Sequence, residues 1–155
     1  MEIEYLKKLV EYPLSSSNYG QTVTPNEPLS MAVITQLEST YNNGNPFPKA
    51  LRELLYLAGS YCYCLVNNVY DPDDYTMQVK LQDFITEELQ FMGYPQTRPF
   101  YGIDQVYPGN FRLVYLDEGD DPIVYGVDES DDTLQPTEKT LSELINYVVR
   151  MKHRL

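Results

Sequence analysis

The sequence predicts an α+β domain in which a mostly antiparallel sheet packs against helices. Apolar residues recur at three- and four-residue intervals in the first half of the chain, which is typical of helices. Short runs rich in Val, Ile and Tyr follow between residues 100 and 127, as expected for strands. A helical pattern then closes the chain. Helices, then consecutive strands, then a final helix favour an antiparallel sheet.

Length and composition fit one globular domain spanning residues 1–155. The chain has 155 residues and is 43% hydrophobic, enough for a substantial core. Its apolar runs are shorter than the roughly 20 residues of a membrane-spanning helix. The acidic start, Met1-Glu2-Ile3-Glu4, differs from the basic start of a signal peptide. We therefore expect a cytoplasmic protein that does not bind membranes.

Three helices are expected in the first third of the chain. Residues 1–12 predict a short one, and residues 13–28, rich in Ser, Asn, Gly and Pro, predict a loop. The second helix is expected to run from Pro28 to Tyr41. The third begins at Pro48, whose missing N–H costs nothing in a first turn, and Gly59 can end it in the left-handed conformation.

The middle of the chain predicts a buried strand, a turn and a fourth helix. Residues 61–66 form a short apolar run and are read as the strand, and residues 71–74 as the turn. Cys62 and Cys64 would share one face of that strand as small buried residues, because this spacing suits neither a disulfide nor a zinc site. The helix is expected over residues 82–92, with Asp83 as its cap.

The last third predicts three strands and a closing helix. The strands cover residues 100–103, 112–116 and 123–127, with a turn at residues 108–110 and a loop from 128 to 136. Thr140 and Glu143 form a capping-box pattern at the start of the final helix. Alternation places Leu113 and Tyr115 on one face of their strand, and Val114 and Leu116 on the other.

The strongest functional signal is acidic. Net charge is −12, and the segment from Asp117 to Asp132 contains eight acidic residues and no basic one. Gly119 and Pro122 supply the tight reversal between two strands. Such a surface would steer a basic partner and repel nucleic acid. We predict a partner-binding set of Asp117, Glu118, Asp120, Asp121, Asp128, Glu129, Asp131 and Asp132, with Tyr115 and Tyr125 as aromatic anchors.

Catalytic and cofactor signatures are weak. The single histidine, His153, lies at the end of the chain, where a catalytic base is rarely held in place. There is no phosphate-binding glycine loop, and the acidic loops lack the spacing of a calcium site. We therefore expect neither enzymatic activity nor a cofactor or metal. A hydrolase or metal-binding domain that uses the clustered carboxylates is kept as a third alternative.

Several segments follow one another in a recognisable order between residues 28 and 150. They are an opening helix that carries the acidic Glu38 in Ile34-Thr-Gln-Leu-Glu38, a helix led by Phe47-Pro48, a glycine at position 59, a strand-turn-strand with Gly119 and Pro122, and a closing helix over 140–149. In this order they resemble the SUKH superfamily, which unites bacterial immunity proteins with yeast regulators of cell-wall synthesis. Residues 1–27 lie outside the resemblance.

The resemblance implies a non-enzymatic immunity protein that neutralises a cognate polymorphic toxin. Many such toxins are nucleases with a basic cleft, and carboxylates can occupy the positions of substrate phosphates there. The alternative is an intracellular scaffold or regulatory module that binds an endogenous protein, as eukaryotic relatives are thought to do. The sequence carries no signal for the oligomeric state.

Overall fold

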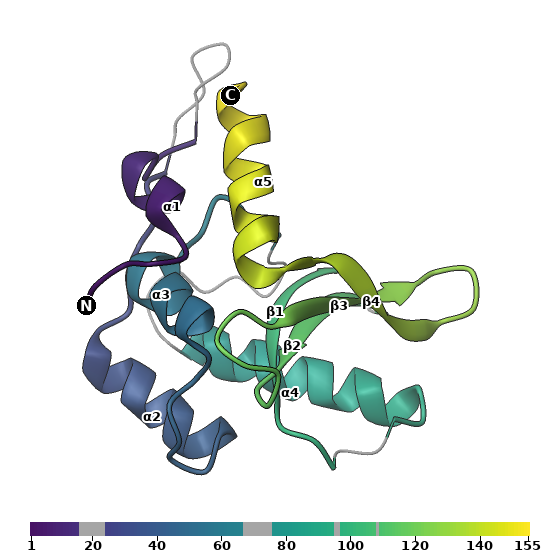
Figure 1. Cartoon of the computed structure of the whole chain (residues 1–155). Helices are drawn as coiled ribbons and strands as arrows, with labels where there is room; N and C mark the ends of the chain where they lie inside the picture. Colours follow the sequence, from purple (N-terminus) through teal and green to yellow (C-terminus); the bar gives the residue numbers. More distant parts are fainter. Residues whose placement is uncertain (16–23, 67–75, 95–96, 108) are drawn as a thin grey trace.

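The helices of the computed structural model follow the predicted order, whereas its strands differ from the prediction in two places. It describes residues 1–15, 24–66, 76–94, 97–107 and 109–155. Within these ranges lie the helices α1 (Lys7–Glu11), α2 (Met31–Tyr41), α3 (Lys49–Ala58), α4 (Thr76–Phe91) and α5 (Leu141–His153), and the strands β1 (Phe100–Tyr107), β2 (Asn110–Tyr115), β3 (Ile123–Asp128) and β4 (Thr133–Thr140) (Figure 1). The strands pair antiparallel in the order β1-β2-β3-β4. The predicted α+β class is confirmed.

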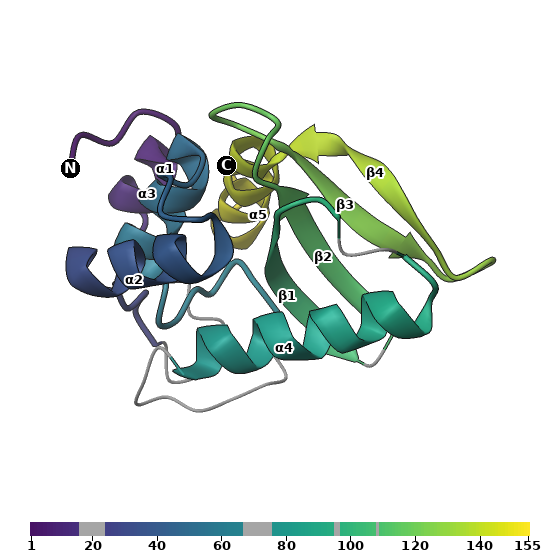
Figure 2. The same ribbon diagram turned by 90° about the horizontal axis from the view of Figure 1, so that it is seen from below.

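The sheet is covered on both faces, and the alternation of β2 assigns each face to different helices. Val114 joins the large core that α1, α2, α3 and α5 build on one face, whereas Leu113 packs on the other face against Leu81 and Ile85 of α4. Both β2 side chains are fully buried. Figure 2 shows α4 running along the sheet on the side away from α5.

A close approach of α4 to β1 depends on a glycine. A Cβ on Gly102 would lie 2.3 Å from Cδ1 of Ile85 and 3.2 Å from Oε1 of Gln82, so a larger residue would displace these two α4 side chains. The buried amide of Gln82 then binds both backbone groups of Gly102, donating from Nε2 to its carbonyl oxygen at 2.9 Å and accepting its N–H at 2.6 Å. The helix side chain thus hydrogen-bonds the strand as a neighbouring strand would.

Two buried glutamates tie extended segments to the helical core. Glu53 of α3 is fully buried, and its carboxylate accepts the backbone N–H groups of Glu4, Tyr5 and Leu6 at 2.8, 2.9 and 3.0 Å. Glu38 of α2 accepts the N–H of Phe47 at 2.5 Å. Glu38 also forms an ion pair with Arg52, at 3.2 Å.

The Glu53 interaction explains why the first helix is shorter than predicted. Residues 1–12 were expected to be helical, but α1 contains only Lys7–Glu11. The three N–H groups before it are bound by the carboxylate of Glu53, which replaces the hydrogen bonds of a helical turn. The predicted loop 13–28 lies partly outside the described residues.

The ends of α3 and α4 also correct the predictions. Pro48 is the N-cap of α3 rather than its first helical residue. Gly59 is the C-cap of α3 and so ends the helix where predicted, but its φ of −72° is right-handed rather than left-handed. A Cβ added at position 59 would lie 2.5 Å from the carbonyl oxygen of Leu55 and 2.7 Å from the Leu29 side chain. The close packing of Leu29 and Leu55 around this position therefore requires glycine. α4 begins at Thr76, which places Asp83 within the helix rather than at its cap.

The predicted strand over residues 61–66 is wrong. Tyr61 forms a single bridge with Glu27, and turns follow. Cys62 and Cys64 are nevertheless buried as predicted, with free thiols. A hydrogen bond with Cys64, together with burial, raises the pKa of the Cys62 thiol. A short apolar run has the same pattern whether it packs on a sheet or against helices, so the sequence could not distinguish them. The predicted turn over residues 71–74 lies outside the described residues.

The predicted loop over residues 128–136 is only partly correct. Residues 129–132 form the turn, but Thr133–Thr140 is the edge strand β4. This strand is mostly exposed and contains Pro136, which is tolerated at an edge because outward-facing backbone groups need no partner strand. Because β4 is mostly polar, its sequence lacks the apolar alternation by which a strand is predicted. At the following helix, the predicted capping box is confirmed, because Thr140 and Glu143 bind each other's backbone N–H.

Replacing Glu53 with Gln should release the N-terminal segment. The amide keeps the size of the side chain but offers one acceptor oxygen and places N–H donors against N–H donors. We expect a loss of about 3 kcal/mol in the free energy of unfolding. Urea unfolding measures this loss, and faster hydrogen exchange at Glu4 to Leu6 would locate it. Glu87→Gln, at an exposed site on α4, is the matched control. Equal stability of the two variants would contradict the assigned role.

Candidate partner-binding groove

The predicted acidic surface is divided between the two ends of the sheet. In an antiparallel sheet the β1–β2 and β3–β4 turns share one end, and the β2–β3 turn lies at the other. The six residues of β3 separate the ends by about 20 Å. Figure 1 shows the β2–β3 turn near α3 and the β3–β4 turn on the far side. Asp117, Glu118, Asp120 and Asp121 therefore do not form one surface with Asp128, Glu129, Asp131 and Asp132.

Most acids of the β2–β3 turn have structural partners. Arg98 donates from Nε to both carboxylate oxygens of Asp117, at 2.9 and 3.0 Å, which lowers the pKa of Asp117. Glu118 is 3.6 Å from the same guanidinium. Asp121 accepts the Ser142 N–H at 2.9 Å and so caps α5. Of the four, Asp120 is exposed and its carboxylate makes no hydrogen bond or ion pair with the described residues, which makes it a useful control position.

The remaining residues of this hairpin hold the fold. Gly119 has φ +84°, in the left-handed region that favours glycine, and the carbonyl of buried Pro122 accepts the N–H of Leu141. Tyr115 and Tyr125 meet edge to face on the α4 side of the sheet, with ring centroids 4.9 Å apart. The Arg98 guanidinium lies 3.9 Å from the Tyr115 centroid. The two tyrosines predicted as anchors are thus half-buried and pack against the sheet.

The β3–β4 turn is shaped by its own acidic side chains. Oδ1 of Asp128 accepts the N–H and hydroxyl of Ser130, which lowers the pKa of Asp128. Asp131 similarly accepts from Thr133. Asp132 has φ +55°, a left-handed conformation that Asp tolerates better than most residues. These contacts fix the turn while all three carboxylates remain exposed.

Glu129 connects this turn to the neighbouring hairpin. Its carboxylate accepts hydrogen bonds from the Tyr107 hydroxyl and the Asn110 side-chain amide. The bond from Tyr107, and next the bond from Asn110, lower the pKa of Glu129. Two hairpins that share no strand are thereby tied together at the acidic end of the sheet.

A groove of about 640 Å³ opens at this end. It is lined by Glu88, Phe91, Met92, Gly109, Asp131 and Asp132. Phe91 is 91% exposed, more than any other large apolar side chain in the described ranges. A Cβ on Gly109 would lie 4.0 Å from Oε2 of Glu88, so this carboxylate overlies the β1–β2 turn. The groove therefore combines an uncovered aromatic ring with carboxylates from two separate elements.

This chemistry suits a ligand that is both cationic and apolar. Carboxylates from α4 and the β3–β4 turn can each accept from a Lys or Arg, and Arg can do so with two parallel bonds. The Phe91 ring offers area for an apolar side chain or a guanidinium face. A free amino acid would leave much of this surface wet, whereas a protein segment could cover it.

The α4 half of the groove was not among the predicted site residues. The signal was available, because Leu81, Ile85 and Leu89 form the buried stripe of α4 and Phe91 falls outside it. An aromatic residue outside the apolar stripe at a helix end marks an exposed anchor. The predicted start of the helix near residue 82 hid the full stripe.

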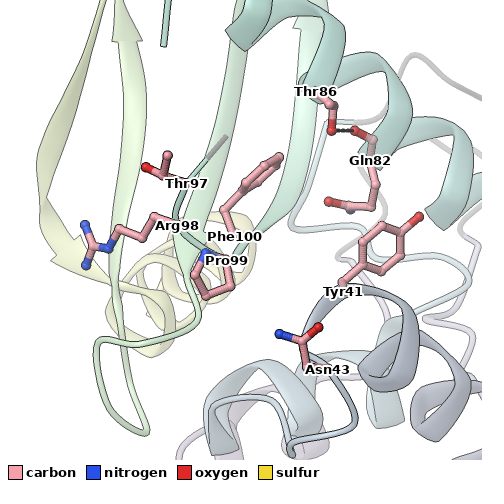
Figure 3. A pocket seen from close by; sticks show the side chains of 8 residues that line it. All are labelled: Tyr41, Asn43, Gln82, Thr86, Thr97, Arg98, Pro99 and Phe100. Carbon is pink, nitrogen blue, oxygen red and sulfur yellow. Dashed lines mark hydrogen bonds between the residues drawn. The ribbon is translucent and has the colours of Figure 1, made fainter. Parts of the chain in front are cut away.

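A second hollow of about 320 Å³ lies between α2, α4 and the start of β1 (Figure 3). The amide of Gln82 is already bound to Gly102, and the Arg98 guanidinium points away from Tyr41 toward the far side. Burial, with a smaller contribution from Asp83, raises the pKa of Tyr41 to about 12. Its hydroxyl is therefore protonated at neutral pH, and the acidic groove is the better candidate site.

No three His, Cys, Asp or Glu side chains in the described ranges are arranged to hold a metal ion. No helix in these ranges is long and apolar enough to cross a bilayer. Comparison with family models, curated proteins and solved structures found no match to the chain.

Tyr107→Phe should raise the pKa of Glu129 toward its ordinary value of 4.5 by removing its strongest donor. Folding lowers the pKa of Glu129, so the hydrogen bonds of its carboxylate stabilise the folded state fully above the ordinary pKa of 4.5. This stabilisation is lost as the pH falls through the lowered pKa of the folded state. A carboxyl NMR titration measures both values. Tyr147→Phe is the control, since its ring is similarly exposed on α5. An unchanged Glu129 pKa in Tyr107→Phe would contradict the hydrogen bond.

Proposed function

We propose that this protein is a non-enzymatic immunity protein that neutralises a cognate polymorphic toxin by binding it at the acidic groove. The observation that supports this most is Phe91, 91% exposed beside Glu88, Asp131 and Asp132. A partner that covered this ring would remove its apolar area from water, which would favour binding. The surrounding charge favours a basic partner.

The resemblance to the SUKH superfamily supports the same proposal. Its segments fall on α2, α3, the β2–β3 hairpin and α5, which build the large core and the end of the sheet opposite the groove. The resemblance thus rests on the scaffold. Partner choice would be carried by α4 and the β3–β4 turn, whose residues lie outside its most specific motif.

Inhibition would follow from occupying the toxin's cleft. A nuclease cleft presents Lys and Arg to substrate phosphates, and the carboxylates of Glu88, Asp131 and Asp132 would take those positions. The rest of the net charge of −12 would speed the encounter at long range. Phe91 would then anchor the complex by entering an apolar recess beside the basic residues.

The proposal predicts that a basic toxin is encoded beside this gene, and binding can be tested with that protein produced as an inactive variant. Phe91→Ala should weaken binding at least about 30-fold, as expected for an aromatic hot spot. Glu88→Lys should slow association about tenfold and flatten its salt dependence. Lys suits the C-terminal end of α4, so this variant should fold. Stopped-flow association and calorimetry separate the two effects.

Asp120→Lys is the matched control, because it makes the same charge reversal at the opposite end of the sheet. Its effect should be confined to long-range steering. Equal binding by Phe91→Ala, Glu88→Lys and the native protein would exclude the groove. If the neighbouring protein is not neutralised, and a housekeeping protein binds through Phe91 instead, the groove stands and the immunity role fails.

A further inference from the structure

Helix α5 has a second apolar stripe on its outer side. Its buried stripe consists of Leu141, Ile145 and Val149, which are fully buried in the large core. Roughly opposite lie Tyr147 and Met151, 48% and 54% exposed, with the partly buried Leu144 one turn before Tyr147. Leu144, Tyr147 and Met151 follow the three- and four-residue spacing of a coiled-coil seam. We call these three residues the outer stripe.

The outer stripe lies on a helix that extends away from the sheet. Figure 1 shows α5 standing above the strands, with α1 beside it and the opposite side open. Lys139 places its ammonium 5.0 Å from the Tyr147 ring centroid, and that contact leaves about half of the tyrosine exposed. The side of α5 that carries the outer stripe thus has room for another helix.

Charged residues beside the outer stripe have opposite signs at its two ends. Glu143 and Arg150 are both exposed and are seven residues apart, so they occupy the same flank, one heptad apart. The acid is at the N-terminal end of the helix and the base at the C-terminal end, next to Lys152 and Arg154. A helix with this arrangement is complementary to a copy of itself running in the opposite direction.

We propose that the outer stripe forms a two-fold symmetric dimer in which the α5 helices of two copies pack antiparallel. Leu144 of each copy would face Met151 of the other, with the two Tyr147 rings near the axis. Glu143 would pair twice with Arg150 of the other copy, using carboxylate capacity beyond the hydrogen bond from the Thr140 N–H. The contact is isologous and closes at two copies.

The parallel arrangement is unfavourable for this sequence. It would bring the cationic ends of two helices together and would set Glu143 against Val148 rather than against a base. Both helix dipoles would also point the same way, whereas antiparallel packing opposes them. One helix face is small, so the dimer belongs to the transient class that buries less than about 1,200 Å². It should therefore dissociate on dilution.

The mass of the full chain should rise with concentration across the micromolar range in sedimentation equilibrium. Met151→Glu should increase the dissociation constant at least about tenfold, because it buries a charge at the seam. Val10→Glu is the matched control, since Val10 is 50% exposed on α1. Circular dichroism of both variants shows that they fold. A native mass equal to one chain at every concentration would overturn the proposal.

Disulfide trapping tests the direction of the helices. A mixture of Leu144→Cys chains and Met151→Cys chains should form a mixed disulfide dimer, and Met151→Cys alone should cross-link poorly. Cys62 and Cys64 are buried and should not compete. Efficient cross-linking of Met151→Cys to itself would show a parallel contact and overturn the antiparallel dimer. The groove residues are not involved, so neutralisation of a toxin by Met151→Glu should be unchanged.

Discussion

The fold depends on side chains that satisfy buried backbone N–H groups where regular structure cannot. Glu53 binds three successive N–H groups of the N-terminal segment, and Glu38 binds that of Phe47. Gln82 bonds to Gly102 of β1, and Asp121 caps α5. An unpaired buried donor costs about twice as much as a hydrogen bond contributes on balance. Each of these contacts therefore joins two elements that apolar packing alone would hold less precisely.

These contacts also set where the exposed chemistry lies. Because Asp121 and Asp117 are engaged at the α5 end of the sheet, that end is held together by its own charges. The other end has α4 and the β3–β4 turn, whose acids shape their own loop and still face solvent. The division follows from antiparallel topology, in which consecutive turns alternate between the two ends of the sheet. The acidic residues between Asp117 and Asp132 thus form two separate surface regions, one at each end of the sheet, with different roles.

The sequence was informative where a pattern has one physical meaning. The capping box at Thr140, the helix that follows Pro48 and the alternation around Val114 each have a single favourable structure, and all are present. It was uninformative where tertiary contacts decide. Gly59 is required by the approach of Leu29, which lies 30 residues away, and the length of α1 is set by Glu53. The groove joins helix and turn residues that no local pattern links.

The strand order β1-β2-β3-β4 has a consequence for how this molecule can associate with others. A sheet edge with free N–H and C=O groups invites another chain to add as a further strand. At one edge, β1 is bonded by Gln82, and its Gln105 N–H is taken by Val66. At the other, β4 places Pro136, which lacks an N–H, in mid-strand beside Glu138 and Lys139. Growth into fibres by strand addition is thereby hindered at both edges.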